Sequence, residues 1–384
     1  MNLPEYFQAV DLKKISSGKS FRDNQWFSQI DFNPDNFKDI DIAILDVSED
    51  RGSKLNKGCS IGANQVRQSL YKLYKGDYSM RVADLGTIPA GNSLTDTYFA
   101  LQETLLFLFK NNVIPVVLGG SRDLSYAIYL AYTKMEQLIN IVSIDAYFSL
   151  GETDDVVNDE NYLSKILLHQ PNALFNFSNL GYQTYFVDQK ELGLLDDLFF
   201  DIYRLGLVKE NIKLAEPIIR NADFLSFSMN AVAQAHSPAN NTASPNGFTA
   251  EHACQMARYA GMNEKLSTFG LFDFNGKHPA AHNTADLMAQ MIWYFVDGFY
   301  HRKGDFPIAN KSTYIKYNIN LENQDLIFYK SQKTDRWWME IPYRAPAFKK
   351  YEKHLMLPCN YDDYLTASAN EIPERWFQTF KKLK

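Results

Sequence analysis

The sequence predicts an α/β protein whose mainly parallel central sheet is covered by helices. Short apolar runs alternate with longer amphipathic stretches along most of the chain, which is the pattern of strands that each lead into a helix. Several runs are apolar throughout, as Val113–Leu118 is, and such runs are typical of strands buried on both faces. The chain has 384 residues, of which 46% are hydrophobic, so it can bury a large core.

Six apolar runs of strand length predict the strands of this sheet, in chain order: Ile40–Val47, Arg81–Leu85, Val113–Leu118, Leu138–Ile144, Phe224–Phe227 and Ser267–Phe274. Five longer, amphipathic stretches predict the helices: Gly62–Tyr74, Leu94–Phe109, Leu124–Met135, Thr249–Tyr259 and Thr284–Tyr300. Ligands of such sheets bind beyond the carboxyl ends of the strands, so the residues that follow the strands are the first candidates for a site.

The composition argues against several classes of partner. A formal net charge of −6 disfavours nucleic acid and anionic membranes. No apolar run approaches the ~18 residues of a membrane-spanning helix, and Met1–Glu5 lack the basic and apolar pattern of a secretory signal. The cysteines match no zinc-binding spacing and favour a reducing compartment: Cys59, Cys254 and Cys359. We therefore predict a cytoplasmic protein.

Three short segments lie where a predicted strand gives way to a loop. Residues 117–123 read Val-Leu-Gly-Gly-Ser-Arg-Asp, residues 143–149 read Ser-Ile-Asp-Ala-Tyr-Phe-Ser, and residues 225–230 read Leu-Ser-Phe-Ser-Met-Asn. Their order, spacing and flanking residues resemble the arginase/agmatinase/formimidoylglutamase (ureohydrolase) family. The Asn-Leu-Gly-Tyr-Gln stretch at residues 179–183 is similar to the formimidoylglutamase branch. The resemblance covers residues 35–330.

This resemblance implies a three-layer α/β/α arginase-like fold, and it identifies a site. The family ends three strands with Gly-Gly-x-His, Asp-Ala-His-x-Asp and Ser-Phe-Asp-x-Asp, and those side chains hold two manganese ions and a bridging hydroxide. In this sequence only Asp145 keeps the family's residue. The other ligand positions carry different side chains, which are Arg122, Tyr147, Ser149, Ser228 and Asn230. Asp273 stands where the family has a glutamate that pairs with the substrate's guanidinium.

The side chains at these positions do not suit a pair of metal ions. A two-metal site needs several charged or imidazole ligands around ions about 4 Å apart, and manganese prefers carboxylate, imidazole and water oxygen. Here Asp145 supplies one negative charge, while Arg122 adds a positive one. We therefore predict no metal and no cofactor, and without a metal-bound hydroxide no catalytic residue can be assigned. The seven residues above would form a former active-site pocket.

Each of these residues has an alternative, purely structural interpretation. Arg122 could bind a ligand, but a counter-ion for Asp145 and Asp273 is favoured, because a buried carboxylate needs a partner. Tyr147 could line a pocket, although filling the volume left by the metals is favoured. The acidic residues within 151–160 could attract a cation, yet they lack the glycine and terminal glutamate of a calcium loop and favour a solvated loop.

The C-terminal extension lies outside the resemblance. Residues 331–384 follow the predicted α/β domain at 35–330, which is itself preceded by an N-terminal segment at 1–34. The extension is too aromatic for a disordered tail, since it holds three of the five tryptophans: Trp337, Trp338 and Trp376. It packs on its own domain or forms an interface, and tryptophans often dominate interfaces. We expect at least one of the three in a subunit or partner interface.

Two functions follow from these observations. The first is a catalytically inactive ureohydrolase-fold protein that acts as a binding or scaffolding protein, as a homo-oligomer or with a protein partner. The second is an active formimidoylglutamase- or arginase-type hydrolase of C–N bonds in linear amidines. A metal-free enzyme would have only Arg122, Asp145 and Asp273 to work with, and these include no nucleophile–base pair.

Overall fold

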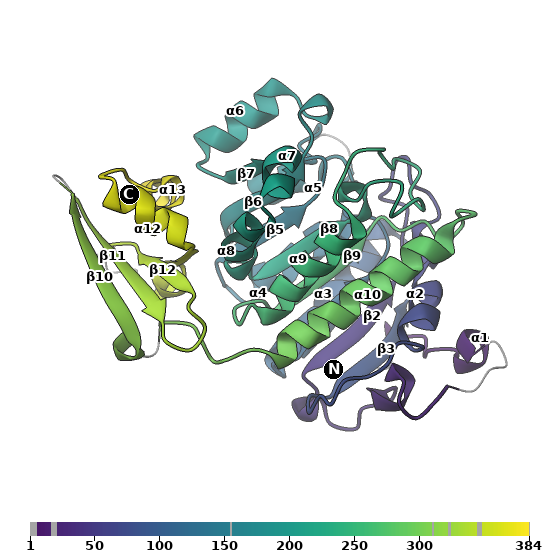
Figure 1. The fold of residues 1–384 in the computed structure, drawn as a ribbon. Coiled ribbons are helices and arrows are strands. Elements are labelled where there is room, and N and C mark those ends of the chain that lie inside the picture. Colours follow the sequence, from purple (N-terminus) through teal and green to yellow (C-terminus); the bar gives the residue numbers. More distant parts are fainter. Residues whose placement is uncertain are drawn as a thin grey trace.

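The computed structural model describes residues 6–16, 21–153, 156–308, 311–321, 324–343 and 348–383. Residues 1–5, on which the prediction about a secretory signal rests, lie outside this part. The described chain forms a large α/β unit followed by a smaller C-terminal unit with an antiparallel sheet (Figure 1). Across the described ranges, no helix is both long and apolar enough to cross a membrane.

The main sheet has the strand order β1-β3-β2-β4-β9-β8-β5-β6-β7, and all neighbouring strands are parallel. Its strands are β1 (Ile30–Asp31), β2 (Ile42–Val47), β3 (Val82–Ile88), β4 (Ile114–Leu118), β5 (Ile139–Ile144), β6 (Leu174–Tyr182), β7 (Asp201–Arg204), β8 (Phe224–Ser228) and β9 (Thr268–Phe272). All six predicted strands are confirmed. Three further strands, β1, β6 and β7, were not predicted. In β6 the side chains of Asn176 and Ser178 interrupt the apolar run, and both donate hydrogen bonds to Asp201 of β7.

Helices cover both faces of this sheet, which confirms the three-layer α/β/α architecture (Figure 1). Val116 and Leu118 of β4 pack toward one face and Val117 toward the other, as the alternation of side chains along a strand requires. The first face carries α2 (Ala63–Leu70), α7 (Leu205–Glu210), α8 (Ala215–Arg220), α9 (Ala250–Met262) and α10 (Ala281–Tyr300). The second carries α3 (Leu94–Lys110), α4 (Leu124–Lys134), α5 (Tyr162–Leu168) and α6 (Gln189–Asp197). A short helix, α1 (Leu12–Ser16), precedes them.

Local sequence signals set the start and the packing of these helices. Ser93 and Asp96 form a reciprocal capping box at the start of α3, with hydrogen bonds of 3.1 and 2.8 Å. Glycines allow α9 and α10 to approach closely, because a Cβ atom on Gly261 would lie 2.0 Å from the carbonyl oxygen of Phe295. Helices α9 and α10 therefore pack directly against each other on this face of the sheet.

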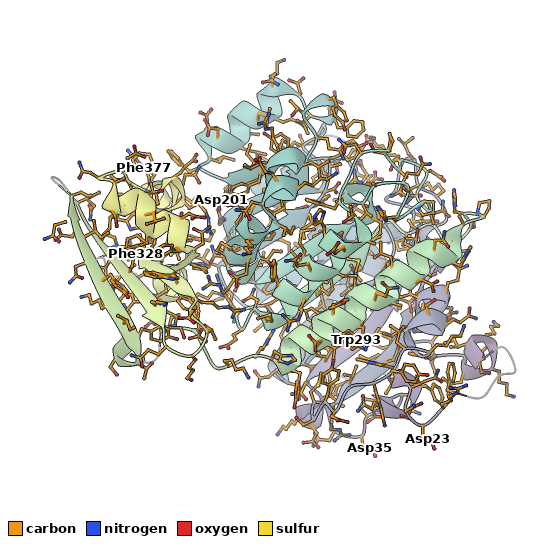
Figure 2. All side chains as sticks on the ribbon, in the orientation of Figure 1. Asp23, Asp35, Asp201, Trp293, Phe328 and Phe377 are labelled. Carbon is orange, nitrogen blue, oxygen red and sulfur yellow. The ribbon has the colours of Figure 1, made fainter. Side chains whose placement is uncertain are left out.

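The C-terminal unit begins earlier than the sequence predicted. Its four-stranded antiparallel sheet has the order β10-β11-β12-β13, and its first strand starts at Tyr314 rather than after residue 331. The strands are β10 (Tyr314–Leu321), β11 (Gln324–Ser331), β12 (Trp337–Glu340) and β13 (Met356–Cys359), and the helices are α11 (Phe348–Tyr351), α12 (Tyr361–Ser368) and α13 (Glu374–Lys382). Figure 2 marks Phe328 of β11 and Phe377 of α13 in this unit, and Asp201 on the neighbouring side of the main unit.

The three tryptophans of this unit lie inside it. Trp338 and Trp376 are 0% and 1% exposed, and Trp337 is 8% exposed. The guanidinium of Arg220 in α8 lies 4.5 Å from the ring centre of Trp338 and donates to the carbonyl oxygens of Trp337 and Cys359 at 3.1 and 3.0 Å. That one of these tryptophans lies in a subunit or partner interface stays a prediction. The alternative, packing on the chain's own domain, describes their position.

Candidate functional site

Four neighbouring strands of the main sheet end where the sequence predicts a site. β4, β9, β8 and β5 lie side by side in this order, and all are parallel, so their carboxyl ends meet at one edge. The seven predicted site residues stand at these ends: Arg122 beyond β4, Asp145, Tyr147 and Ser149 beyond β5, Ser228 and Asn230 at the end of β8, and Asp273 beyond β9. The sheet thus brings together residues as far as 151 positions apart.

A glycine turn positions Arg122. Gly119 and Gly120 have φ angles of 86° and 60°, in the left-handed region that glycine tolerates best. A Cβ atom on Gly120 would lie 2.6 Å from the carbonyl oxygen of Glu49, so a side chain has no room there. The chain turns sharply after β4, and the side chain of Arg122 is only 8% exposed.

The guanidinium of Arg122 lies between two carboxylates. Its Nη1 donates to Oδ2 of Asp273 at 3.3 Å, and its Nε lies 3.4 Å from Oδ2 of Asp145. The backbone N–H of Arg122 also donates to Oδ1 of Asp273 at 3.2 Å. Nε donates further to Ser149 Oγ and to the carbonyl oxygen of Asp159, at 3.1 and 3.0 Å. Both ion pairs that the counter-ion interpretation predicts are present.

Asp145 is incompletely compensated in this cluster. Burial raises the pKa of its carboxyl group to about 7, although the positive charge of Arg122 acts in the opposite direction. The contact of 3.4 Å between Nε of Arg122 and Oδ2 is close enough for an ion pair, but Oδ2 has no hydrogen-bond partner. The backbone N–H of Tyr147 donates to the other oxygen, Oδ1, at 3.3 Å. The site therefore holds a buried acceptor with spare capacity.

Ser228 and Asn230 hold Asp273 in place. Ser228 donates from Oγ to Oδ2 of Asp273 at 2.5 Å and accepts the backbone N–H of Asn230 at 3.1 Å. The amide nitrogen of Asn230 lies 3.5 Å from the same carboxylate oxygen, while its Oδ1 accepts from Thr242 Oγ1 at 2.8 Å and from the side-chain amide of Asn240. These side chains serve a hydrogen-bond network inside the protein.

Tyr147 covers the cluster rather than filling it. Its half-buried ring has its centre 5.3 Å from Cζ of Arg122, a cation–π distance. The opposite contact is a stack on Phe186 at 4.9 Å between ring centres, and Phe186 in turn meets Tyr185 at 4.7 Å. Our interpretation that Tyr147 fills the volume of the metals is corrected, because the ring is partly exposed and lies over the guanidinium.

Two aspartates that sequence reasoning missed belong to the same region. Asp123 is buried and accepts hydrogen bonds from the hydroxyls of Ser121 and Tyr98, and burial raises its pKa to about 7. Asp159 was assigned to a solvated acidic loop, but it is 6% exposed and accepts from Ser53 Oγ at 3.0 Å. The position of Asp123 next to Arg122 in the sequence could have marked it as a site residue. No feature of the sequence around Asp159 distinguishes it from the other acidic residues of its loop. The acidic residues at 154 and 155 lie outside the described part.

The family resemblance implies a pair of manganese ions at this edge, but the side chains present there do not suit such a pair. Within the described ranges, no group of three His, Cys, Asp or Glu side chains could hold a metal ion. Asp145 and Asp273 both pair with Arg122, a permanent cation that lies between them. A divalent ion in that position would face the guanidinium at short range, where like charges repel strongly.

Comparisons with known proteins agree with the fold. The chain is 25% identical over 310 residues to the formimidoylglutamase of Staphylococcus carnosus, covering 76% of this chain and 92% of the relative. Against the formimidoylglutamase of Streptococcus gordonii the identity is 24% over 298 residues, covering 70% and 90%.

Solved structures with the same fold include Trypanosoma cruzi formiminoglutamase with Mn²⁺ and Bacillus subtilis formimidoylglutamase. Both have a TM-score of 0.66 and 18% identity. They cover 73% and 74% of this chain, and 99% and 96% of their own chains. The model of the arginase family matches residues 40–297, which span the main sheet from β2 to β9 and most of α10 but not β1. The chain therefore belongs to the arginase family.

Proposed function

We propose that this protein is an arginase-family member in which a buried ion-pair cluster replaces the two-metal centre, and that it acts by binding rather than by hydrolysis. The observation that carries the proposal is the position of Arg122 between Asp145 and Asp273. The guanidinium is permanently charged and cannot leave by losing a proton. Metal binding would require this side chain to leave a site where it is 8% exposed.

Charge balance supports the same proposal. A pair of divalent ions needs several anionic ligands to offset the cost of losing water. Ser228 and Asn230 contribute neutral groups that already serve Asp273, and Ser149 donates from Oγ to the carbonyl oxygen of Asp159 at 2.7 Å. Two hydroxyls of this region donate to carboxylates, Ser228 to Asp273 and Ser121 to Asp123, but both serines are buried, so neither pair is open to a substrate.

The second candidate is an active hydrolase of C–N bonds in linear amidines. It is favoured by one observation, which is that the two relatives compared above are named formimidoylglutamases and match the chain across the main unit. In that case Asp145, Asp123 and Asp159 would have to turn toward a metal that displaces Arg122. The spare acceptor on Asp145 would be its first ligand.

Manganese content separates the two candidates. The parent protein and the variant Arg122→His are each purified in excess manganese, and bound metal is measured by plasma mass spectrometry. We expect far less than one ion per parent chain and no hydrolysis of formimidoylglutamate, arginine or agmatine. Stoichiometric manganese in the parent, lost in Asp145→Ala but kept in the surface variant Asp188→Ala, would overturn the proposal.

We also propose that the protein works in the cytoplasm and binds a protein partner or a second copy. The three cysteines are free and buried, which supports a reducing compartment. If the protein also binds a small molecule, we propose that it does so at the cluster around Arg122. Capture of partners by the full-length chain from its native cell tests this part, and identical capture by the parent and by Tyr147→Ala would place the binding surface outside the cluster.

A further inference from the structure

The outer side of β10 is an unpaired sheet edge. β10 is the first strand in the order β10-β11-β12-β13, and Figure 1 shows it at the side of the C-terminal unit that faces away from the main unit. Among the residues that the structure describes, no strand and no isolated bridge pairs with its outer side. A free edge presents unpaired backbone N–H and C=O groups that can accept a further strand.

β10 lacks the features by which proteins usually protect such an edge. It is eight residues long and pairs with β11 along its whole length without a bulge. It contains no proline, and Lys316 is its only charged residue. Short edge strands, bulges, prolines and charged side chains, lysine above all, are the common means of blocking edge-to-edge association, and of these β10 has a single lysine. The strand is therefore competent to pair with another strand.

The side-chain pattern of β10 is complementary to itself. The odd positions carry Ile315, Tyr317, Ile319 and Leu321, and after Tyr314 the even positions carry Lys316, Asn318 and Asn320. Two antiparallel copies pair odd with odd and even with even, because residues directly opposite each other lie on the same face. If the two-fold axis that relates the two copies passes through the Asn318 pair, Ile315 of one copy lies opposite Leu321 of the other. Lys316 of one copy then lies opposite Asn320 of the other. Apolar side chains then meet only apolar ones.

Charge selects between the two central registers. The strand runs from Tyr314 to Leu321, so an axis at Tyr317 or at Asn318 uses it almost completely. With the axis at Tyr317, the two Lys316 side chains are two positions apart along the pair. With the axis at Asn318 they are four positions apart, which reduces their repulsion. The second register is therefore favoured.

Exposed apolar side chains beside β10 would extend such a contact. Ile315 of β10 is 42% exposed. α12 lies over the strand, because the ring of Tyr364 is 5.4 Å from that of Tyr317. The same helix exposes Tyr361 and Leu365 by 53% and 47%. A stable interface usually buries at least about 1,200 Å² in total, so contacts beyond the backbone ladder are needed, and α12 supplies apolar surface for them.

We propose that a second copy of this chain pairs its β10 with β10 in antiparallel orientation, about a two-fold axis at Asn318, so that two four-stranded sheets become one continuous sheet. An isologous contact of this kind closes on itself and forms no open fibre. The proposal rests on the C-terminal unit alone. It does not depend on whether the edge of the main sheet binds metal.

The mass of the full chain in solution tests this pairing. In Asn318→Lys, two added positive charges lie directly opposite each other on the axis, and like charges in that position are destabilising. Light scattering should give Asn318→Lys half the mass of the parent. Asn92→Lys, which adds the same charge to the main unit, should keep the parental mass. Mixing Asn318→Lys with Asn318→Glu should restore the parental mass, which shows that the variants are folded.

A cross-link tests the register. The three native cysteines are buried, so Asn318→Cys adds an accessible thiol at the proposed axis. Diamide takes up the two electrons and two protons released when two such thiols form one disulfide, and a covalent dimer should appear. Asn92→Cys, the matched control, should stay monomeric under denaturing conditions. An unchanged mass of Asn318→Lys, or equally fast cross-linking of both cysteine variants, would overturn the proposal.

Discussion

Arg67 and Arg122 are both buried and both lie between two aspartates of the main unit, but their charges are matched to different degrees. Arg67 of α2 donates from Nε and Nη2 to the two carboxylate oxygens of Asp84 at 2.9 and 2.8 Å, and its Nη1 pairs with Asp46. Tyr71 donates a further hydrogen bond to Asp84 at 2.6 Å. This is the planar, two-bond arrangement in which an arginine and a carboxylate interact most strongly.

The contacts of Arg122 are longer and fewer. Its distances to Asp273 and Asp145 are 3.3 and 3.4 Å, and one oxygen of Asp145 has no hydrogen-bond partner. Arg67 closes a saturated structural ion pair, whereas Arg122 sits in a cluster that has acceptor capacity to spare. The ion pairs at the carboxyl ends of β4, β5 and β9 are therefore less complete than those of Arg67, and incompletely satisfied buried groups are typical of a present or former functional site.

The largest expected effect is the loss of stability on removing each arginine. Arg67→Met should lower the free energy of unfolding by about 5 kcal/mol and Arg122→Met by about 3 kcal/mol, the two ends of the range for breaking a buried ion pair. The order follows from the number and length of the bonds lost. Urea unfolding at pH 7 measures both values. Equal costs, or a larger cost for Arg122→Met, would remove the distinction between the two clusters.

The second effect concerns pH. Burial raises the folded-state pKa of Asp145 to about 7, above the ordinary value of about 3.9 that applies when the chain is unfolded. The folded state therefore binds this proton more tightly, and stability falls as pH rises between these two values, by at most about 1.4 kcal/mol per pH unit.

Asp145→Asn should flatten this decline. Urea midpoints at pH 5 and pH 8 should differ less in the variant than in the parent, although Asp123, whose pKa is also raised to about 7, maintains part of the dependence. The double variant with Asp123→Asn should be flatter still. A decline as steep in Asp145→Asn as in the parent would show that the cluster carries no such proton.

The smallest expected effect comes from the aromatic cover. Tyr147→Leu removes the ring that lies over the guanidinium of Arg122, and a partly exposed cation–π contact contributes about 1 kcal/mol. Thermal unfolding should show a small decrease. Phe186→Leu, which removes the outer partner of the stack and leaves the ring on the guanidinium, should cost less. If Phe186→Leu lowers the unfolding temperature more than Tyr147→Leu does, stacking on Phe186 rather than contact with Arg122 holds the ring of Tyr147 in place.

Much of the main unit could be predicted from the chain itself. β4, β8 and β9 are buried along their whole length, and the segments that follow β4 and β9 carry enough of the family's pattern to place Arg122 and Asp273 at one edge. Their ion pair follows from elementary charge balance in a buried site. β6 was missed because Asn176 and Ser178 satisfy one neighbouring strand rather than the solvent, and such a pairing has no local signature.

The sequence by itself determined the alternation of strands and helices, the family, and the residue types at the strand ends, because periodicity and motif spacing are local properties of a chain. Only the tertiary structure decided which way ambiguous side chains face. Asp159 and Trp338 look like a loop acid and an interface anchor, yet both are buried by segments distant in sequence. Ser53 contacts Asp159 from 106 residues away, and Arg220 of α8 contacts Trp338 of β12. No pattern within a short window of residues records contacts over such separations.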